Sequence, residues 1–374
     1  MSRTPSQIPG RRAWLVAVMA LLLLAPVPPA DAAPGSWLEA GRLRSSREFH
    51  PAVALPDGRV MVSGGFGNDG ILDTTELYDP ADRAWHTGFP MDKQRLGHTA
   101  TLLPDGRVLA AGGANLADGY VASAELFDPV ETTWSTAGKL RRERNNHTAT
   151  LLPDGRVLVA GGLTTSHTVL RSAELYDPAT GTWSAAANLR QSRFHHTATL
   201  LPSGGVLVAG GETGSGAFSR TAEIYDPAAN RWIVARPMCE GRANHTATLL
   251  PGGGTLVAGG GDRAPGFTRG SEIYYPKANR WRRTRPLAKA RGFHVASLLP
   301  NGRVLVAGGF ADSGTLRSAE LFRPSTRRWT RAPRMRAGRG HASVALIPKG
   351  VLVAGGARTT GLLVPSAELY RWPR

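Results

Sequence analysis

Cysteine is almost absent from this chain of 374 residues, since Cys239 is the single one. One thiol excludes a disulfide within the chain, and its position excludes a lipid-modified cysteine at an N-terminal cleavage site. Helical periodicity is also missing, because no stretch repeats apolar residues at a helical spacing. The sequence has no nucleophile motif, no phosphate-binding loop and no metal-ligand spacing. These absences disfavour a disulfide-rich or helical protein and the enzyme classes that carry such motifs.

The first residues have the pattern of a secretory leader. Three arginines within the first twelve residues give a positive start, 13–27 is an apolar run of 15 residues, and Ala30-Asp31-Ala32 is a small-residue cleavage site. The alternative is a membrane anchor, but a span needs about 20 residues. We therefore predict a signal peptide over residues 1–32, a single folded domain over 33–374, and a secreted protein, periplasmic or extracellular, with no membrane span after cleavage. Removal of the leader leaves 42 basic and 27 acidic residues, a formal charge of +15.

One motif recurs seven times at a step of 47 to 49 residues, and it reads most clearly over 147–162 as HTATLLPDGRVLVAGG. It predicts two short strands joined by an Asp-Gly hairpin turn of type I′. A variable loop, an alternating third strand such as 172–176 and a fourth strand at a tryptophan follow. Four short antiparallel strands in each of seven repeats predict a β-propeller. The paired glycines that end the second strands are Gly64/Gly65, Gly112/Gly113, Gly161/Gly162, Gly210/Gly211, Gly259/Gly260, Gly308/Gly309 and Gly355/Gly356.

The glycine pair, the segment Glu-Leu-Tyr-Asp-Pro and the tryptophan that follows it resemble a kelch repeat. The resemblance covers essentially all of 33–374. It implies an all-β fold, a seven-bladed propeller of kelch repeats. The glutamate of the motif is present in every copy, as Glu76, Glu125, Glu174, Glu223, Glu272, Glu320 and Glu368.

The tryptophans predict how the ring closes. Only six of them follow the seven glycine pairs, namely Trp85, Trp134, Trp183, Trp232, Trp281 and Trp329. Trp37 lies one repeat step before Trp85, so the N-terminal strand around Trp37 is expected to complete the last blade. Other propellers close similarly, with both termini in one blade. Closure pairs an edge that would otherwise invite aggregation.

Seven histidines keep the same step: His50, His98, His147, His196, His245, His294 and His341. Symmetry would place their imidazoles in seven separate crevices, so we expect buried, hydrogen-bonded core histidines and no metal site. We predict no cofactor. The last histidine follows its arginine, Arg339, by two residues instead of three, and we interpret this as a residue missing at that point. The Asp-Gly turn also shortens to Lys349-Gly350 in this copy, which helps to explain its step of 47 residues.

Seven arginines precede these histidines: Arg47, Arg95, Arg144, Arg193, Arg242, Arg291 and Arg339. They are expected as a ring near the channel mouth, where the outer strand of one blade leads into the inner strand of the next. In kelch adaptors that recruit acidic peptides, such arginines form the binding bowl, so the resemblance implies that they bind a carboxylate, sulfate or phosphate. The alternative is an inter-blade salt bridge with the repeated glutamate. No catalytic residue is assigned.

The variable loops after the glycine pairs are expected to carry specificity. Their distinctive residues are Phe66, Asn68, Asp69, Asn115, Asp118, Tyr120, His167, Glu212, Phe218, Asp262, Arg263, Phe267, Phe310, Asp312 and Arg358. The later blades are strongly basic, which favours either a patch for an anionic polymer or a solvated arginine-rich edge. The arginines concerned are Arg282, Arg283, Arg285, Arg323, Arg327, Arg328, Arg331, Arg334 and Arg336.

We predict a secreted, non-catalytic, monomeric propeller whose loop face binds a carbohydrate or an acidic protein or peptide, with no specific nucleic acid. The alternative is a sugar-active enzyme, because kelch propellers include bacterial proteins that act on sialic acid as mutarotases and the central domain of galactose oxidase. The copper chemistry of that oxidase needs a tyrosine crosslinked to a cysteine, and Cys239 is expected in a loop between blades. A third interpretation is an adhesion module within a larger assembly.

Overall fold

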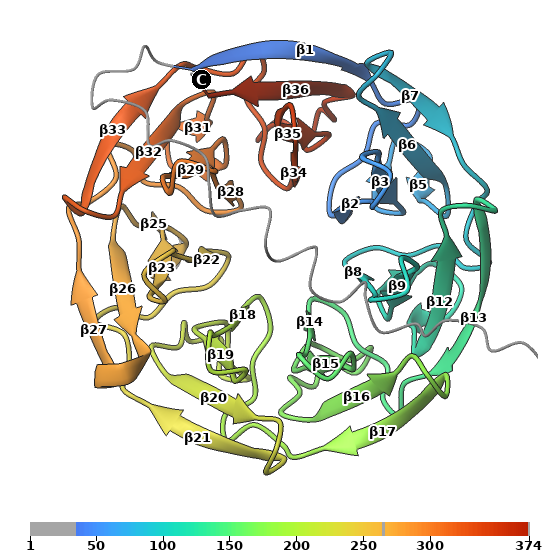
Figure 1. Cartoon of the computed structure of the whole chain (residues 1–374), viewed down its shortest axis with the longest axis horizontal. Coiled ribbons are helices and arrows are strands. Elements are labelled where there is room, and N and C mark those ends of the chain that lie inside the picture. Colours follow the sequence, from blue (N-terminus) through green and yellow to red (C-terminus); the bar gives the residue numbers. More distant parts are fainter. Residues whose placement is uncertain (1–34, 264–265, 373–374) are drawn as a thin grey trace, which may run out of the picture.

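The computed structural model describes residues 35–263 and 266–372. Seven four-stranded antiparallel sheets lie around a central axis (Figure 1). The predicted all-β, seven-bladed propeller is therefore confirmed. The predicted signal peptide, residues 1–32, lies outside the described residues. Among the described residues, no helix is long and apolar enough to cross a membrane.

The strands of the first four blades run from the axis outward in chain order. Blade 1 contains β2 (Ala52–Ala54), β3 (Val60–Ser63), β6 (Thr75–Asp79) and β7 (Ala84–Thr87). Blade 2 contains β8 (Thr99–Leu102), β9 (Val108–Ala111), β12 (Ser123–Asp128) and β13 (Thr133–Lys139). Blade 3 contains β14 (Thr148–Leu151), β15 (Val157–Ala160), β16 (Ala173–Asp177) and β17 (Thr182–Ala186). Blade 4 contains β18 (Thr197–Leu200), β19 (Val206–Ala209), β20 (Ala222–Asp226) and β21 (Arg231–Ala235).

The remaining three blades complete the ring. Blade 5 contains β22 (Thr246–Leu249), β23 (Thr255–Ala258), β26 (Ser271–Tyr275), the 3-10 turn η1 (Pro276–Ala278) and β27 (Arg280–Arg283). Blade 6 contains β28 (Val295–Leu298), β29 (Val304–Ala307), β32 (Ala319–Arg323) and β33 (Arg328–Ala332). Blade 7 contains β34 (Ser343–Ile347), β35 (Gly350–Ala354), β36 (Ser366–Arg371) and β1 (Ser36–Arg42).

Four of the variable loops carry a short hairpin of their own. These hairpins are β4 (Phe66–Gly67) with β5 (Gly70–Ile71), β10 (Ala114–Asn115) with β11 (Gly119–Tyr120), β24 (Gly261–Arg263) with β25 (Gly266–Phe267), and β30 (Phe310–Ala311) with β31 (Gly314–Thr315). All of them directly follow the second strand of a blade, so they lie on one face of the ring, which we call the loop face.

Burial explains why each blade needs its neighbours. All four side chains of β15 are buried, because the strand is covered by a blade on either side. On the outer strand β17, the ring of Trp183 lies 5.0 Å from that of Tyr176, and its indole nitrogen donates to Ala137 O of blade 2 at 2.9 Å. The repeated tryptophan therefore joins each blade to the preceding one.

The turn between β14 and β15 differs from the predicted type I′. Gly155 has a φ of +89°, but Asp154 is not among the residues with positive φ. The Gly155 N–H donates to Leu152 O at 3.0 Å, and the Leu152 N–H donates to Arg156 O at 2.8 Å. This pattern fits a type I turn followed by a left-handed glycine, which is the next commonest way to close a short hairpin.

The N-terminal strand closes the ring, as predicted. β1 pairs antiparallel with β36 and places Trp37 opposite Tyr370. Trp37 is buried, and its indole nitrogen donates to Pro333 O of the neighbouring connection at 2.9 Å. Figure 1 shows β1 outside β36, beside the C-terminal end of the described chain. The first and last blades are thus held together by a strand from the opposite end of the chain.

Candidate functional site at the axial end of the loop face

The seven predicted binding arginines are buried, with exposures of 0–1%. Each pairs with the repeated glutamate of the blade that it leads into. Arg144 shows the pattern, since its Nη2 donates to Glu174 Oε1 at 2.6 Å and its Nη1 donates to Gly161 O at 2.7 Å. The corresponding pairs are Arg47–Glu76, Arg95–Glu125, Arg193–Glu223, Arg242–Glu272, Arg291–Glu320 and Arg339–Glu368, at 2.7–3.1 Å.

These pairs anchor the connections between blades. Glu174 also accepts hydrogen bonds from the backbone N–H groups of Arg141 and Arg142, at 2.6 and 3.2 Å. A ligand that reached Arg144 would have to displace both the glutamate and the backbone that it holds. This corrects the expectation of arginines open at the channel mouth. The alternative, a salt bridge with the repeated glutamate, is confirmed, except that each arginine pairs within the blade that it leads into and does not bridge two blades.

Six of the seven histidines are core residues that join neighbouring blades. His196 shows the pattern, because its Nε2 lies 2.9 Å from Thr148 Oγ1 of blade 3. Burial lowers the pKa of all six imidazoles, and for His98 and His245 the pKa falls to about 3. They are therefore neutral hydrogen-bonding groups. The six are His50, His98, His147, His196, His245 and His294.

The seventh histidine, His341, does not belong to this set. Ser343 begins β34 four residues after its arginine, as Val295 does in β28. Ser343 pairs with Ala354, whereas Val295 pairs with Ala307, so the residue absent from the last repeat lies in the hairpin turn. Ala342 occupies the position of the core histidine, and His341 lies one position earlier. The expectation of a residue missing before His341 was wrong.

His341 belongs to a second set, the residues two after each arginine, which we call the axial ring. All seven have φ between +52° and +64°. Each donates its backbone N–H to the carbonyl of its counterpart in the preceding blade at 3.0–3.3 Å, so the bonds form a closed circle. The axial ring consists of Phe49, Gly97, Asn146, His195, Asn244, Phe293 and His341.

The axial ring lies beside the variable loops. In each blade the residue before the ring position forms an antiparallel bridge with the residue after the glycine pair, as Glu48 does with Phe66 and Gly292 does with Phe310. The ring and these bridging residues therefore form the centre of the loop face. Repeat symmetry ends here, because the ring side chains differ from blade to blade.

Aromatic side chains gather on one side of this centre. Phe49 packs against His341 with ring centroids 3.7 Å apart and an interplanar angle of 30°. Phe293 and Phe310 meet the same imidazole edge-on, at 4.4 and 5.0 Å. Phe267 continues the cluster, 6.4 Å from Phe293. These four phenylalanines, contributed by blades 1, 5 and 6 and their loops, are called the aromatic cluster below.

A carboxylate orients the imidazole at the centre of the cluster. Glu48 Oε2 lies 2.7 Å from His341 Nδ1, and both side chains are mostly buried, at 16% and 14% exposure. The other ring nitrogen, Nε2, is buried and has no hydrogen-bond partner among the described residues. When the imidazole carries a single proton, on Nδ1 facing the carboxylate, the lone pair of Nε2 can accept a hydrogen bond from a hydroxyl.

The rest of the axial ring is polar. Within the axial ring, His195 Nδ1 is a second buried nitrogen without a partner among the described residues, a state that it shares with Nδ1 of the six core histidines. Burial, followed by the nearby His341, lowers the pKa of His195 to about 4, so this imidazole is also neutral. Asn146 and Asn244 flank it in the ring. Burial also raises the pKa of Glu212, which bridges to Phe194 beside His195.

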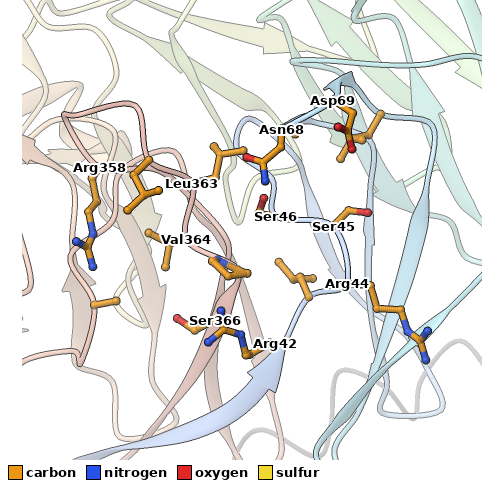
Figure 2. A pocket seen from close by; sticks show the side chains of 16 residues that line it. Arg42, Arg44, Ser45, Ser46, Asn68, Asp69, Arg358, Leu363, Val364 and Ser366 are labelled. Carbon is orange, nitrogen blue, oxygen red and sulfur yellow. The ribbon is translucent and has the colours of Figure 1, made fainter.

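Seven of the fifteen predicted loop residues lie at two places. Phe267 and Phe310 belong to the aromatic cluster, while Phe66 and Glu212 form the bridges around the axial ring. By contrast, Asn68, Asp69 and Arg358 line a groove of about 730 Å³ at the seam between blades 7 and 1 (Figure 2). The sequence analysis did not single out the axial ring. The available signal was a pair of neighbouring positions, between the repeated arginine and the repeated histidine, whose residue types change from copy to copy.

Comparison with known proteins supports the kelch assignment. A family model described as Attractin/LZTR1 beta-propeller matches residues 36–262, and a Kelch motif model matches residues 291–336. No curated protein matches the chain. A solved fungal alcohol oxidase of the AA5 family, in complex with copper, is 18% identical with a TM-score of 0.74, over 91% of this chain and 76% of that chain. The structure of YjhT is 14% identical with a TM-score of 0.62, over 78% of this chain and 99% of that chain. At these identities the two structures show a shared fold.

Within the described residues, no three histidine, cysteine, aspartate or glutamate side chains group as metal ligands. Cys239 is exposed in the connection between blades 4 and 5, where its N–H donates to Glu272.

The match to the propeller family model spans more than half of the chain, and a second model matches a Kelch motif in the part that follows. The chain therefore belongs to the Attractin/LZTR1 β-propeller family.

Proposed function

We propose that the protein binds a carbohydrate at the axial ring, with one face of a sugar ring packed against the aromatic cluster. The observation that carries this proposal is the pairing of aromatic surface with unsatisfied hydrogen-bonding nitrogens. Phe49 and Phe293 pack against His341, whose Nε2 has no hydrogen-bond partner among the described residues. His195 Nδ1 also lacks a hydrogen-bond partner there. Small-ligand sites combine apolar and aromatic walls with a few placed polar groups in this way.

A sugar suits these groups because it has an apolar C–H face and a rim of hydroxyls. Aromatic rings present broad apolar surfaces for the first, and imidazole, amide and carboxylate groups accept or donate for the second. Behind the ring, the inner strands line a cavity of about 400 Å³. Residues directly after the axial ring positions in the chain line this cavity, so it lies along the axis behind the ring and provides space for part of a ligand.

The charge of the site favours a neutral sugar over an acidic partner. The seven repeated arginines are buried against glutamates and are not available. The ionisable groups around the axial ring are Glu48 and Glu212 with the imidazoles of His195 and His341. A carboxylate-bearing ligand would thus meet carboxylates here without a guanidinium partner.

A panel of neutral and uronic oligosaccharides, tested with the purified protein by saturation-transfer NMR, examines this proposal. We expect transfer to the C–H protons of one face of a neutral sugar, and loss of that transfer in His341→Asn. Asparagine suits this position because it tolerates positive φ and already occupies two axial ring positions. His86→Asn on the outer strand is the matched control. Transfer that persists in His341→Asn would place the sugar elsewhere.

A second candidate function is acid–base catalysis on the bound sugar, and the Glu48–His341 contact favours it. A carboxylate that fixes one imidazole nitrogen and leaves the other unpaired is the arrangement of a general base, and Nε2 becomes accessible here only when a side chain of the aromatic cluster moves. His341 Nε2 would take the proton of the anomeric hydroxyl as the bond between C1 and the ring oxygen breaks, and water would protonate the ring oxygen. Reclosure on the other face of the aldehyde returns the proton and gives the other anomer, as in mutarotation. Exchange spectroscopy should show faster anomer interconversion with the wild-type protein than with His341→Asn. Binding without acceleration would leave the carbohydrate-binding function alone.

A further inference from the structure

Charge is distributed unevenly around the ring. The strands and turns of blade 5, residues 246–283, contain six basic and two acidic residues, a net charge of +4. Blade 6, residues 295–332, has the same six and two, again +4. Blade 2, residues 99–139, has two basic and five acidic residues, a net charge of −3. The repeat itself therefore does not require the positive charge of blades 5 and 6.

The excess lies on the outer strands. β27 reads Arg-Trp-Arg-Arg and β33 begins Arg-Trp-Thr-Arg, whereas β13 and β17 begin Thr-Trp-Ser-Thr and Thr-Trp-Ser-Ala. In each strand the tryptophan donates to the preceding blade, so only this residue is needed to build the ring. Arg231 also precedes the tryptophan of β21 in blade 4, so the arginines that follow the tryptophan in β27 and β33 are what sets these two neighbouring blades apart.

Strand geometry brings the two groups of arginines to one junction. Trp329 of β33 faces blade 5, where its indole nitrogen donates to Ser271 Oγ at 3.0 Å. Because side chains alternate along a strand, Arg331 also faces blade 5, and Arg282, next to Trp281 on β27, faces blade 6. The backbone N–H of Arg285 donates to Arg327 O at 3.2 Å. Figure 1 shows β27 and β33 as neighbours on the outer rim.

We call this surface the outer arginine strip, and it consists of Arg280, Arg282, Arg285, Arg327, Arg328 and Arg331. Five of its side chains are exposed and that of Arg327 is half-buried. Among the described residues, none of the six forms an ion pair. The adjacent Arg283 pairs with Glu240 at 3.3 Å. The nearest repeated glutamates, Glu272 and Glu320, are buried against their own arginines. The strip is a run of like charge without counter-charges, which favours an anionic partner.

We propose that the outer arginine strip binds an acidic polysaccharide. The strip extends over two blades on the outer rim, so a linear polymer can present successive carboxylates or sulfates to successive guanidinium groups. Nucleic acid is disfavoured because single strands bind through exposed aromatic rings as well as charge. Trp281 and Trp329 pack 5.0 Å from Tyr274 and Phe322, and their indole nitrogens are already hydrogen-bonded. The predicted leader would also take the protein to where such polysaccharides occur.

Two triple variants with equal charge change test the proposal. Arg282→Ser, Arg285→Ser and Arg331→Ser remove three charges from the strip. Arg42→Ser, Arg44→Ser and Arg358→Ser remove three from the groove at the seam of blades 7 and 1, where Figure 2 shows them around the cavity. All six side chains are exposed, so both variants should fold. The probes are heparin, polygalacturonate and a duplex DNA of similar length, each titrated at several salt concentrations.

We expect the strip variant to lose at least tenfold in affinity for one of the two polysaccharides, with a weaker salt dependence, and the groove variant to stay within twofold of wild type. Equal losses of affinity in both variants would show that binding depends only on net charge. A loss confined to the groove variant would show that the polysaccharide binds at the groove and not at the strip. Tighter binding of the DNA than of either polysaccharide, or no binding at all, would overturn the proposal. Arginine labelling of the wild-type protein with phenylglyoxal, read by mass spectrometry, provides a mutation-free check, in which the polysaccharide should protect strip peptides selectively.

Discussion

Glu48 Oε2 lies 2.7 Å from His341 Nδ1, although 293 residues separate them along the chain. Glu48 belongs to the first blade and His341 to the last, so the contact crosses the seam where the ring closes. His50 Nε2 crosses the same seam to Ser343 Oγ at 2.8 Å. The candidate site is thus assembled by ring closure.

The Glu48–His341 contact should appear as coupling between the two residues. We expect Glu48→Ala and His341→Asn to be non-additive in urea unfolding, with a coupling free energy of about 0.5–3 kcal/mol, because the two groups share one hydrogen bond. The measurement is a double-mutant cycle on the free energy of unfolding. Additivity within about 0.3–0.5 kcal/mol would mean that the contact contributes little in solution.

The buried ion pairs should contribute far more to stability than the exposed ones. Arg144–Glu174 and Arg156–Asp154 have the same 2.6 Å separation, but the first pair is buried and the second largely exposed. Glu174→Ala leaves a buried guanidinium uncompensated, and we expect a loss of about 3–5 kcal/mol. Asp154→Ala should cost about 1 kcal/mol or less. Denaturant unfolding of both variants measures this difference. Similar losses of stability would contradict the burial of the Arg144–Glu174 pair.

Acid should destabilise the protein below neutral pH. The pKa of His98 and of His245 is about 3 in the folded chain, against an ordinary value of 6.5, because burial disfavours the charged imidazole. Below pH 6.5 the unfolded chain binds protons that the folded chain does not, so stability falls as the pH falls, until the folded pKa is reached. Each such histidine contributes up to about 1.4 kcal/mol per pH unit. A melting temperature that stays constant from pH 7 to pH 5 would contradict this burial.

Two glycines, Gly161 and Gly181, allow a test of how closely the backbones of neighbouring segments approach each other. A Cβ on Gly161, at φ +65°, would lie 2.5 Å from Arg193 O and 2.8 Å from His196 Cε1. Gly181 has almost the same φ, +67°, with nothing within 4 Å. Gly181→Ala should cost about 1–2 kcal/mol for the left-handed conformation alone. Gly161→Ala should lower the free energy of unfolding by clearly more, as measured by thermal unfolding. Equal losses in the two variants would show that the close contacts of Gly161 add no steric cost.

The sequence was sufficient to predict the architecture. Seven glycine pairs predict the blades, and the step from Trp37 to Trp85 predicts the closing strand, because a repeat fixes which residues face a neighbouring blade. The sequence was not sufficient to predict whether the repeated arginines are exposed. An arginine such as Arg144 at a blade connection looks the same whether it faces solvent or a glutamate 30 residues later.

The register of the last repeat was mispredicted for a physical reason. Spacing alone could not show whether the missing residue lay before His341 or in the turn after Ile347, and the strand register decides this. The axial ring depends on that register, since a shift of one residue turns a core position into a ring position. A comparison of the copies position by position would have found it, because Asn146, Phe293 and His341 occupy one place in the repeat.

The measurement that tests the account most directly is the affinity of the best neutral sugar for four proteins, determined by titration calorimetry. These are the wild-type protein, His341→Asn, Phe293→Asn and the outer-strand control His86→Asn. The account predicts a loss of at least tenfold in the two axial ring variants and an unchanged affinity in the control, with all four proteins folded at the temperature of the titration. Unchanged binding in both ring variants would contradict it, because the axial ring would then not be the site.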